Sequence, residues 1–378
     1  MLARKMKKLL TICIPTYKRP ITLRRCIISV VEQIQRYGLE VQVQVYVTND
    51  ASPDNTAQIL DEFKPLNYFT YVNRENNLGM SANIKSMLEE ALLESIFQLI
   101  ITDDDYLQPD TLDLVVKYLE CQHAKNPDVS LIWTPRYSYT EDGKLHVVVC
   151  RSFQEDTLIP PSTKNAGRYM FNGFVLSGLI LKSEDIDFFL WHGNLENAFF
   201  PVIFSGELMM RKPSLFWDLN LVHHTVLNVC HWEDWGRSEA EINLRLFVDF
   251  INSYAVIGRR IKSSLQTIFF YVSAYPSILR MMGSLLISST NVFRLSYGES
   301  AVLRNIAKVS FLKVEPPTRI LFFVAAIRIL SGCLFNVAKY KILSYISIDR
   351  SKKEKCHEAF LHNRQRLANA VFLIRWST

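Results

Sequence analysis

The chain has 378 residues, of which 49% are hydrophobic and 12% aromatic, and its formal net charge is +6. This length and composition are sufficient for a buried core and predict a main domain with an appended region. The seven cysteines are scattered, and no two have the close spacing of a zinc or redox pair, which disfavours both kinds of site. We therefore expect reduced thiols in a cytoplasmic environment.

The N-terminus starts with basic residues and a short apolar stretch, as a secretion signal does. However, Pro15 interrupts the stretch, Tyr17, Lys18 and Arg19 follow it, and no small-residue cleavage site is present. We therefore expect a first strand here in place of a signal.

Strands and helices alternate in the first part of the chain. The hydrophobic pattern predicts strands at residues 9–17, 41–50, 69–74 and 97–102, and helices at about 21–37, 56–63 and 81–93. Such alternation predicts an α/β fold with a mostly parallel sheet, whose ligands lie along the carboxyl edge. The loops that follow the strands are therefore the informative ones: residues 15–19, 49–55, 76–80 and 102–106.

Three consecutive aspartates, Asp103, Asp104 and Asp105, follow the apolar run that ends at Ile101. Clustered carboxylates repel one another without a cation, and hard oxygen ligands favour Mg²⁺ or Mn²⁺. A plain turn or a helix cap is the alternative interpretation. Because Asp110 can cap a helix that begins near residue 111, the triplet exceeds what one cap needs. The sequence thus predicts a metal and an anionic ligand.

Net charge divides the chain in two. From Ala255 onward, 19 Lys and Arg face 5 Asp and Glu, whereas the preceding part has 24 against 32, so the net charges are +14 and −8. The pattern also changes in this region, to long apolar helices with interspersed Lys and Arg. We expect a catalytic domain over residues 1–238 and a mainly helical, basic region over residues 239–378.

Four segments carry a family resemblance: ICIPTYKRP, VYVTNDASPDNT, RENNLGMSANI and IITDDDYLQPD, in this order. Together they resemble the nucleotide-sugar-binding motifs of family 2 glycosyltransferases with the GT-A fold. The resemblance is clear over about residues 1–120 and looser to about 235. In the looser part, FVLSGLILKSEDID and NAFFPVIFSGELMM look like the abequosyltransferase-like branch, which builds O-antigen and related surface polysaccharides.

The resemblance implies a nucleotide-sugar site at the first three loops. Asp50 would accept a hydrogen bond from a nucleobase N–H, with Pro15, Tyr17 and Arg19 around the nucleotide. An Asx turn with Ser52 and Pro53 is the alternative for Asp50. In the third loop Gly79 permits close backbone approach, and either a loop-shaping role or direct donor contact is open for the residues Asn77, Gly79 and Asn83.

The aspartate triplet corresponds to the DXD motif of the family, with a departure. Aligned on the residues that follow, the usual first acid falls on Thr102, so Asp103 faces the ribose or the sugar and Asp104 is the metal ligand. Asp105 would then support the site or touch the donor sugar. If the register shifts by one, Asp103 and Asp105 become the pair. The cation would act as a Lewis acid on the leaving diphosphate.

Family 2 enzymes are expected to invert the anomeric centre, which requires a general base for the acceptor hydroxyl. The family commonly supplies it from a Glu-Asp pair at the start of a helix, and the best match is Glu196 with Asn197. Asn197 cannot act as a base, and Glu196 also fits an acid in the first turn of a helix. Other acids stay open: Glu184, Asp185, Glu207, Glu233 and Asp234.

The stretch LVHHTVLNVCHWEDWGRSE contains His223, His224 and His231. Adjacent histidines on a strand point to opposite faces, so the first two cannot easily share a zinc ion. In related enzymes a histidine after the last strand completes the metal shell, and His231 is placed for that role. Trp232, Trp235 and Arg237 would form a loop over the diphosphate.

Two rear segments, at residues 264–287 and 318–346, are strongly apolar, and the second approaches spanning length. Arg319 and Arg328 interrupt the second, which favours helices lying in the plane of the membrane surface. The positive charge favours an anionic cytoplasmic leaflet. A helical subdomain packed on the catalytic domain is the alternative. Nucleic acid is disfavoured because the aromatic residues stand in apolar runs.

The favoured function is a metal-dependent glycosyltransferase that moves a sugar from a nucleotide-sugar to a lipid-linked saccharide acceptor in O-antigen or capsule synthesis. It would be cytoplasmic and peripherally associated with the inner face of the cell membrane. A nucleotidyltransferase and a non-catalytic scaffold of a polysaccharide assembly complex are the alternatives. The donor sugar, the nucleobase, the acceptor and the oligomeric state are left open.

Overall fold

The computed structural model describes residues 7–140, 144–149, 151–188, 194, 196–225 and 239–289. The chain divides into two compact units, Met1–Cys230 and His231–Thr378. The boundary predicted at residue 238 remains a proposal.

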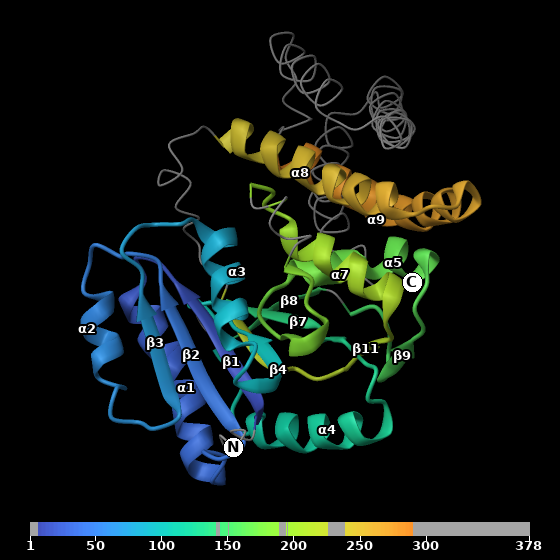
Figure 1. The fold of residues 1–378 in the computed structure, drawn as a ribbon. Coiled ribbons are helices and arrows are strands. Elements are labelled where there is room, and N and C mark those ends of the chain that lie inside the picture. The colour runs from blue at the N-terminus through green and yellow to red at the C-terminus, as the bar shows by residue number, and fades with distance from the viewer. Residues whose placement is uncertain are drawn as a thin grey trace, which may run out of the picture. The chain divides into compact units, whose positions relative to one another are not determined.

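The first unit begins with the predicted alternation of strands and helices (Figure 1). The strands are β1 (Lys8–Thr16), β2 (Val43–Asn49), β3 (Phe69–Asn73) and β4 (Ser95–Ile100), and the helices between them are α1 (Pro20–Tyr37), α2 (Thr56–Asp61) and α3 (Met80–Ala91). Each lies within a few residues of its predicted range. The prediction of an α/β fold is confirmed.

The main sheet has the strand order β3-β2-β1-β4-β10-β6-β11-β9. The first four strands are mutually parallel, and β10 (Leu179–Lys182) joins β4 antiparallel, so the sheet is mixed. The chain proceeds outward from β1 to β2 and β3, and then returns to the other side of β1 to form β4. This reversal is a topological switch point, where open α/β sheets bind their ligands beyond the carboxyl ends of the strands.

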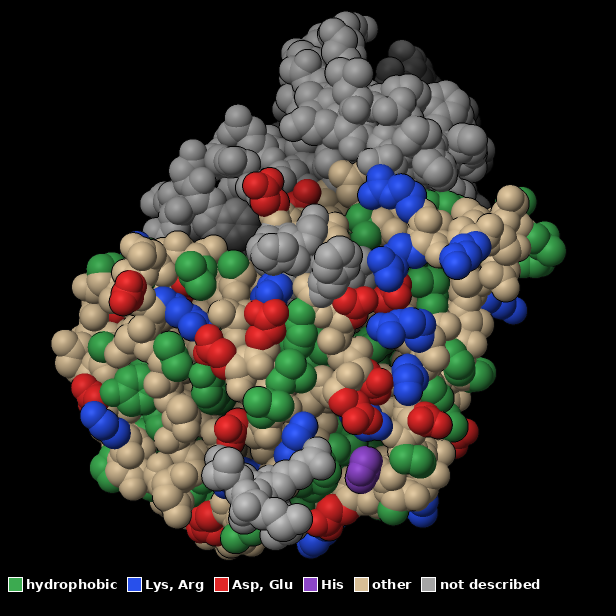
Figure 2. Space-filling view, in the orientation of Figure 1, with side chains coloured by type: hydrophobic (Ala, Val, Ile, Leu, Met, Phe, Trp, Pro, Cys, Tyr) green, Lys and Arg blue, Asp and Glu red, His purple; other side chains and the backbone are tan. Residues whose placement is uncertain are grey.

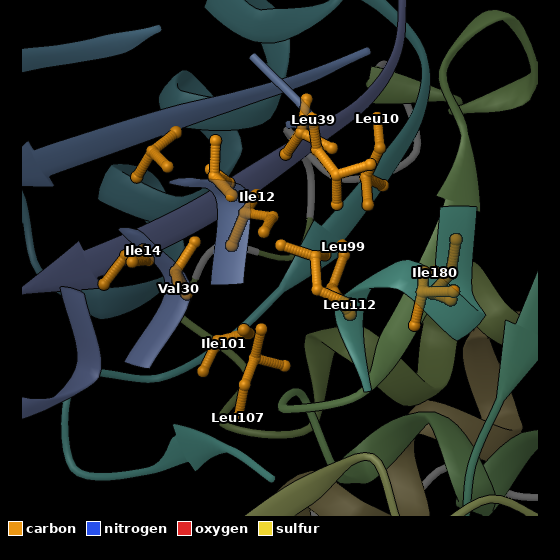
Figure 3. Close-up of a cluster of buried hydrophobic side chains, with 14 of the residues drawn as sticks. Leu10, Ile12, Ile14, Val30, Leu39, Leu99, Ile101, Leu107, Leu112 and Ile180 are labelled. Carbon is orange, nitrogen blue, oxygen red and sulfur yellow. The ribbon is translucent and has the colours of Figure 1, made fainter. Parts of the chain in front are cut away.

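The core of this unit lies between the sheet and the helices α1 and α4 (Leu112–Lys125). Buried side chains of β1 and β4 meet Val30 of α1 and Leu112 of α4, and the labelled members of this cluster are drawn in Figure 3. The inward-facing residues of β1 are Leu10, Ile12 and Ile14, which alternate along the strand as a pleated strand requires. This packing fixes the carboxyl ends of β1 and β4 side by side.

A second sheet has the order β5-β12-β7-β8. Its strand β5 (Tyr106–Leu107) begins directly after the aspartate triplet and pairs antiparallel with β12 (Val222–Thr225). The triplet is therefore held between the two sheets. The other elements of this unit are β6 (Leu131–Trp133), β7 (Arg136–Tyr139), β8 (Leu145–Val149), β9 (Thr157–Ile159), α5 (Thr163–Tyr169), the 3₁₀ helices η1 (Met170–Phe174) and η2 (Ser183–Asp185), α7 (Phe200–Arg211) and β11 (Ser214–Phe216).

The predicted cap of α4 by Asp110 is wrong. The residue before the helix is Thr111, and Asp110 has a left-handed backbone with φ +61°. Its carboxylate accepts hydrogen bonds from Arg36 Nη1 at 2.8 Å and Tyr37 Oη at 2.6 Å, both at the end of α1. Asp110, in the loop just before α4, thus contacts the end of α1, and the sequence around Pro109 did not predict this contact.

The described part of the second unit consists of α8 (Glu239–Arg260) and α9 (Ser264–Ser289). The helices pack through buried rings of Tyr254 and Phe270, whose centroids are 6.0 Å apart, and Gly258 lies close to Tyr271. None of the described helices is long and apolar enough to cross a membrane. The predicted segment at residues 318–346 lies outside the described residues.

Candidate active site

Asp103 is buried at the switch point, one loop beyond β4. Its Oδ2 accepts a hydrogen bond from Thr16 Oγ1 at 2.7 Å, and its Oδ1 accepts one from Arg19 Nη1 at 3.2 Å. Both partners come from the end of β1. Burial, and repulsion from Asp104, raise the pKa of Asp103 to about 7, although Arg19 and Thr16 oppose this change. The carboxyl is therefore poised to lose its proton when a cation approaches.

Asp104 is half-buried beside it. Its Oδ2 accepts a second hydrogen bond from the same nitrogen, Arg19 Nη1, at 2.8 Å, and its backbone carbonyl accepts one from Arg25 Nη2 at 3.0 Å. One guanidinium nitrogen thus bridges the two carboxylates. The two carboxylates thus place negative charge around one point, and the positively charged guanidinium of Arg19 lies at that point.

The donor set fits a divalent cation of the Mg²⁺ type. Such ions commonly bind proteins through one or two carboxylates and take their other ligands from water and substrate phosphates. Asp103 and Asp104 supply two hard carboxylates at the edge of a sheet. The described residues contain no cluster of three or more His, Cys, Asp or Glu that could hold a metal alone. A site built from these residues therefore depends on the ligand for its remaining oxygens.

Asp105 is buried, and its carboxylate contacts the second sheet, whereas those of Asp103 and Asp104 contact Arg19. Its Oδ2 lies 2.9 Å from Nδ1 of His224 on β12 and accepts a hydrogen bond from Thr102 Oγ1 at 3.1 Å. Burial alone would raise the pKa of Asp105, but the contact with His224 holds that pKa below its ordinary value. Burial lowers the pKa of His224, so a neutral imidazole donates to an ionised carboxylate. In this structure Asp105 supports the loop.

The neighbouring His223 makes a different set of contacts. Its ring stacks between Tyr106, with centroids 4.3 Å apart, and Tyr139, with centroids 4.2 Å apart. The guanidinium of Arg25 lies over the other side of Tyr106, 4.6 Å from the ring centroid. The two histidines therefore project to different sides of β12, as the sequence predicted. Both hold the aspartate loop, one through Asp105 and the other through Tyr106.

Asp50 is buried at the end of β2. Its two carboxylate oxygens accept the backbone N–H groups of Leu78 at 2.8 Å and Gly79 at 2.9 Å. The predicted alternative of an Asx turn at Asp50 is wrong, because that turn is made by Asn49, whose Oδ1 accepts from Ser52 N at 3.1 Å. Asp50 thus joins the second loop to the third. A carboxylate oxygen has two lone pairs, so each retains capacity for a further donor.

The third loop owes its shape to Gly79, at the start of α3. Its φ of +83° with ψ of 156° is a conformation almost restricted to glycine, and a Cβ at this position would meet no atom within 4 Å. Backbone conformation and not close packing therefore requires the glycine. Asn77 Oδ1 accepts from Gly79 N at 3.0 Å, and Asn83 Nδ2 donates to Thr48 O at 3.3 Å. Asn83 Oδ1 is buried without a hydrogen-bond partner.

The first loop lies beside the second. Pro15 pairs with Thr48 in the register of β1 and β2, and Tyr17 is exposed. Lys18 has a left-handed φ of +58°, and its N–H donates to Ser52 Oγ at 2.9 Å. The structure therefore brings Pro15, Tyr17, Arg19, Asp50, Asn77, Gly79, Asn83 and the triplet to the ends of three neighbouring strands and the loop before α3.

Glu196 is exposed and lies in the turn before α7, which begins at Phe200 with no acid in its first turn. The interpretation of Glu196 as a first-turn acid is therefore wrong. Asn197 Oδ1 accepts from Phe199 N at 2.7 Å, so this residue shapes the entry to the helix.

Three rival acids are disfavoured by their positions. Glu184 and Asp185 follow β10, whose last residue Lys182 lies opposite Phe97 near the start of β4, so both are at the sheet edge remote from the triplet. Glu207 is buried within α7 and lies 3.2 Å from Arg211 Nε. Glu233, Asp234 and His231, and the proposed closing loop, lie outside the described residues.

Four residues of the site were missed by sequence reasoning: Thr16, Arg25, Ser177 and His224. Ser177 Oγ accepts from Thr102 N at 2.9 Å and so holds the residue before the triplet. Thr16 and Arg25 stand in or near the first loop, but Ser177 and His224 are distant in sequence. The only available signal for His224 was its position on a short strand next to a second histidine.

Comparison with known proteins shows what this chain resembles. The model described as glycosyl transferase family 2 matches residues 11–160. Over 253 residues the chain is 21% identical to the abequosyltransferase RfbV of Salmonella typhimurium, an alignment that covers 64% of this chain and 72% of the relative. A chondroitin synthase of Pasteurella multocida is 27% identical over 137 residues, which are 36% of this chain and 13% of that protein.

Solved structures share the fold. TarS 1–349 of S. aureus in complex with UDP-GlcNAc aligns with a TM-score of 0.57 at 16% identity, covering 84% of each chain. The structure of TarS 1–349 without that ligand aligns with a TM-score of 0.55 at 17% identity, covering 84% of this chain and 83% of TarS. At these identities the likeness shows the fold alone, which is the predicted GT-A fold.

Proposed function

The model of glycosyl transferase family 2 matches residues 11–160, and on this premise we propose that the chain moves a sugar from a nucleotide-sugar to a saccharide acceptor with the help of Mg²⁺ or Mn²⁺. The family match favours glycosyl transfer over the nucleotidyltransferase and scaffold alternatives. The donor sugar, its nucleobase and the linkage formed are outside this proposal.

One observation carries the proposal: Asp50, Asp103 and Asp104 lie beyond the carboxyl ends of parallel strands. Asp50 directly follows β2, Asp103 and Asp104 follow β4, and β1 pairs with both of these strands. Thr16 at the end of β1 and Arg19 in the loop after it contact Asp103. The first two loops would hold the nucleoside, with Asp50 as an acceptor for a base N–H. The triplet would face the diphosphate and the sugar.

Asp104 would hold the cation, and Asp103 would face the cation or the ribose. A bound divalent cation would stabilise the charge of the leaving diphosphate as a Lewis acid. Arg19 would then release one or both carboxylates and is long enough to turn toward the phosphates, for which its planar fork of donors is suited. Asp105 would keep its bond to His224 throughout. His231 is our proposal for a further ligand.

Glu196 is our proposed general base. An inverting transfer needs a carboxylate that takes the proton of the acceptor hydroxyl on the face opposite the leaving group. Glu196 is an exposed acid in a turn, whereas Glu184 and Asp185 lie at the remote edge of the sheet and Glu207 is buried within α7. The carboxylate of Glu196 would therefore bind the acceptor side of the reaction.

The acceptor is proposed to be a lipid-linked saccharide in O-antigen or capsule synthesis, at the cytoplasmic face of the membrane. The similarity to an abequosyltransferase supports the polysaccharide class. The net charge of +14 after residue 254 supports a location beside anionic lipid. Residues 121–238 would contain the acceptor half, and residues 239–378 would form the membrane-associating region.

A donor screen tests this proposal. The full-length protein is incubated with UDP-, GDP-, CDP- and dTDP-sugars, with Mn²⁺ or with EDTA, and released nucleoside diphosphate is measured. We expect slow hydrolysis of one nucleotide class that requires the metal. Hydrolysis that is equally fast in EDTA would contradict the role of the cation, and no release from any donor would contradict the proposed function.

A further inference from the structure

One face of α9 is apolar and exposed. Its side chains are exposed by between 51% and 62%, and they recur with the spacing i, i+3, i+4 and i+7: Leu265, Ile268, Phe269 and Val272. That spacing places them on a single stripe along the helix. We call these four residues the α9 stripe.

The opposite face of the same helix is buried. Phe270 contacts the ring of Tyr254 on α8, and Ala274 and Ile278 are fully buried. Helix α9 is therefore apolar on two faces, of which only one is used for packing against α8. A helix that is apolar on both sides is typical of one that contacts another apolar phase.

The segment that contains the stripe has basic residues and no acidic ones. Residues 259–289 contain Arg259, Arg260, Lys262 and Arg280 and no Asp or Glu, and three of these four basic residues stand at the turn between α8 and α9. Arg259, Arg260 and Lys262 are exposed. Figure 2 shows Lys and Arg side chains close to hydrophobic ones over the part of the chain that Figure 1 labels α8 and α9.

We infer that the α9 stripe inserts into the surface of a bilayer that contains anionic lipid, with Arg259, Arg260 and Lys262 on the headgroup phosphates. Binding of this kind grows with the apolar area buried and with attraction to anionic lipid. This inference rests on the membrane location proposed above and names the face that makes the contact.

Charge disfavours two other occupants of the stripe. Residues 290–378 contain 15 Lys and Arg against 5 Asp and Glu, so this segment is positive like the surface it would cover. A second copy of the same surface would bring the positive charges of Arg259, Arg260 and Lys262 against the same three residues. An anionic lipid surface is the complementary partner.

Vesicle co-sedimentation of the full-length protein tests the inference. The vesicles are neutral phosphatidylcholine, or the same lipid with phosphatidylglycerol. One variant replaces all four residues of the α9 stripe by Ser, and another carries Arg259→Gln, Arg260→Gln and Lys262→Gln. The matched control, Val41→Ser with Leu93→Ser, removes two highly exposed apolar side chains of the first unit.

We expect salt-sensitive binding to the anionic vesicles, weakened at least about tenfold in the stripe variant and up to about a hundredfold in the charge variant, with the control unchanged. Equal binding to neutral vesicles, or wild-type binding by both variants, would overturn the inference. A change from dimer to monomer with unaltered vesicle binding would assign the stripe to a contact between copies.

Donor hydrolysis separates this inference from the proposed function. Every variant should hydrolyse the donor at the wild-type rate in the absence of vesicles, because none of the altered residues belongs to the donor site. If the stripe variant loses hydrolysis because it misfolds, the vesicle binding of the charge variant tests the inference, since that variant replaces only exposed side chains. Loss of vesicle binding with normal hydrolysis supports the inference.

Discussion

At the scale of single residues, the site is governed by the pairing of Asp103 with Asp104. One is buried with its pKa raised to about 7, and the other is half-buried, and a single nitrogen of Arg19 lies between them. Without a divalent cation, the carboxyl of Asp103 therefore tends to hold a proton beside Asp104. With a divalent cation bound, both carboxyls would be ionised. This exchange of a proton for a cation would connect the geometry to the proposed metal dependence.

The raised pKa of Asp103 predicts how stability responds to pH. The folded state holds the proton up to about pH 7, whereas the unfolded chain releases it near the ordinary value of 3.8. The folded state therefore binds more protons in this window, and the free energy of unfolding contributed by Asp103 falls as pH rises from about 4 to about 7.

Asp103→Asn should remove this dependence. In EDTA, the melting temperature of the wild type should fall relative to that of the variant as pH is raised from about 5 to about 8. Parallel melting curves for the two proteins across this range would show that Asp103 titrates at its ordinary pKa.

Glu196→Gln should abolish transfer to the acceptor and leave donor binding intact, because a neutral amide cannot take the hydroxyl proton. A loss of about a hundredfold or more in kcat is expected for a general base. The matched control is Glu184→Gln, an exposed acid at the remote edge of the sheet. Normal turnover by the Glu196 variant would assign the base to another residue.

Single residues also show where sequence reasoning stops. The acids and the glycine of the loops could be chosen because their residue types and the order of the motifs point to one chemistry. Their partners could not: Ser177 holds Thr102, the residue before the triplet, across 75 positions, and His224 contacts Asp105 across 119. Contacts between such distant positions depend on tertiary packing, which no local pattern records.

At the scale of elements, the strand β12 is the support of the aspartate loop. His224 holds Asp105, and His223 stacks on Tyr106, so a short strand from the end of the first unit fixes a loop from its middle. Asp105 therefore acts as a positioning residue, and in the proposed function the side chains of Asp103 and Asp104 would face the ligand.

Replacing His224 tests this support. His224→Ala removes one of the donors to the buried carboxylate of Asp105 and leaves that of Thr102, which should cost about 1–3 kcal/mol in the free energy of unfolding. We also expect a higher Mn²⁺ concentration for half-maximal donor hydrolysis. His224→Asn places an amide N–H near the position of Nδ1 and should restore much of both.

The control for His224 is His123→Ala, which removes a half-buried ring packed on Phe97, away from the triplet. It should alter stability without changing the dependence on Mn²⁺. If His224→Ala and His123→Ala behave alike, His224 contributes only to packing.

The loop before α3 depends on the left-handed backbone conformation of Gly79. Gly79→Ala forces a side chain into a backbone region that costs about 1–3 kcal/mol, and it should displace the two N–H groups that Asp50 accepts. We expect weaker donor binding in a titration with the nucleotide-sugar. The control Gly38→Ala is also strained, at φ +64°, but at the end of α1. Equal donor affinity in both variants would contradict a role for the third loop.

At the scale of the whole molecule, alternation of strands and helices was sufficient to predict the first half of the sheet. Each predicted element appears, since period-2 and period-3.6 patterns are local properties of the chain. The rest of the first unit was harder to predict from the sequence, because β5, β6 and β9 are two or three residues long and pair with strands that are distant in sequence. The second sheet, and with it the support of the triplet, could not be foreseen.

The central claim is that Asp104 and a divalent cation bind the donor together. Thermal shift measures this directly, with wild type, Asp104→Asn and the exposed control Asp128→Asn, each with the nucleotide-sugar selected by the donor screen, with and without Mn²⁺. We predict that Mn²⁺ and donor together raise the melting temperature of the wild type and the control more than the donor alone does, and that this increment is absent from Asp104→Asn. An undiminished increment in Asp104→Asn would contradict the account.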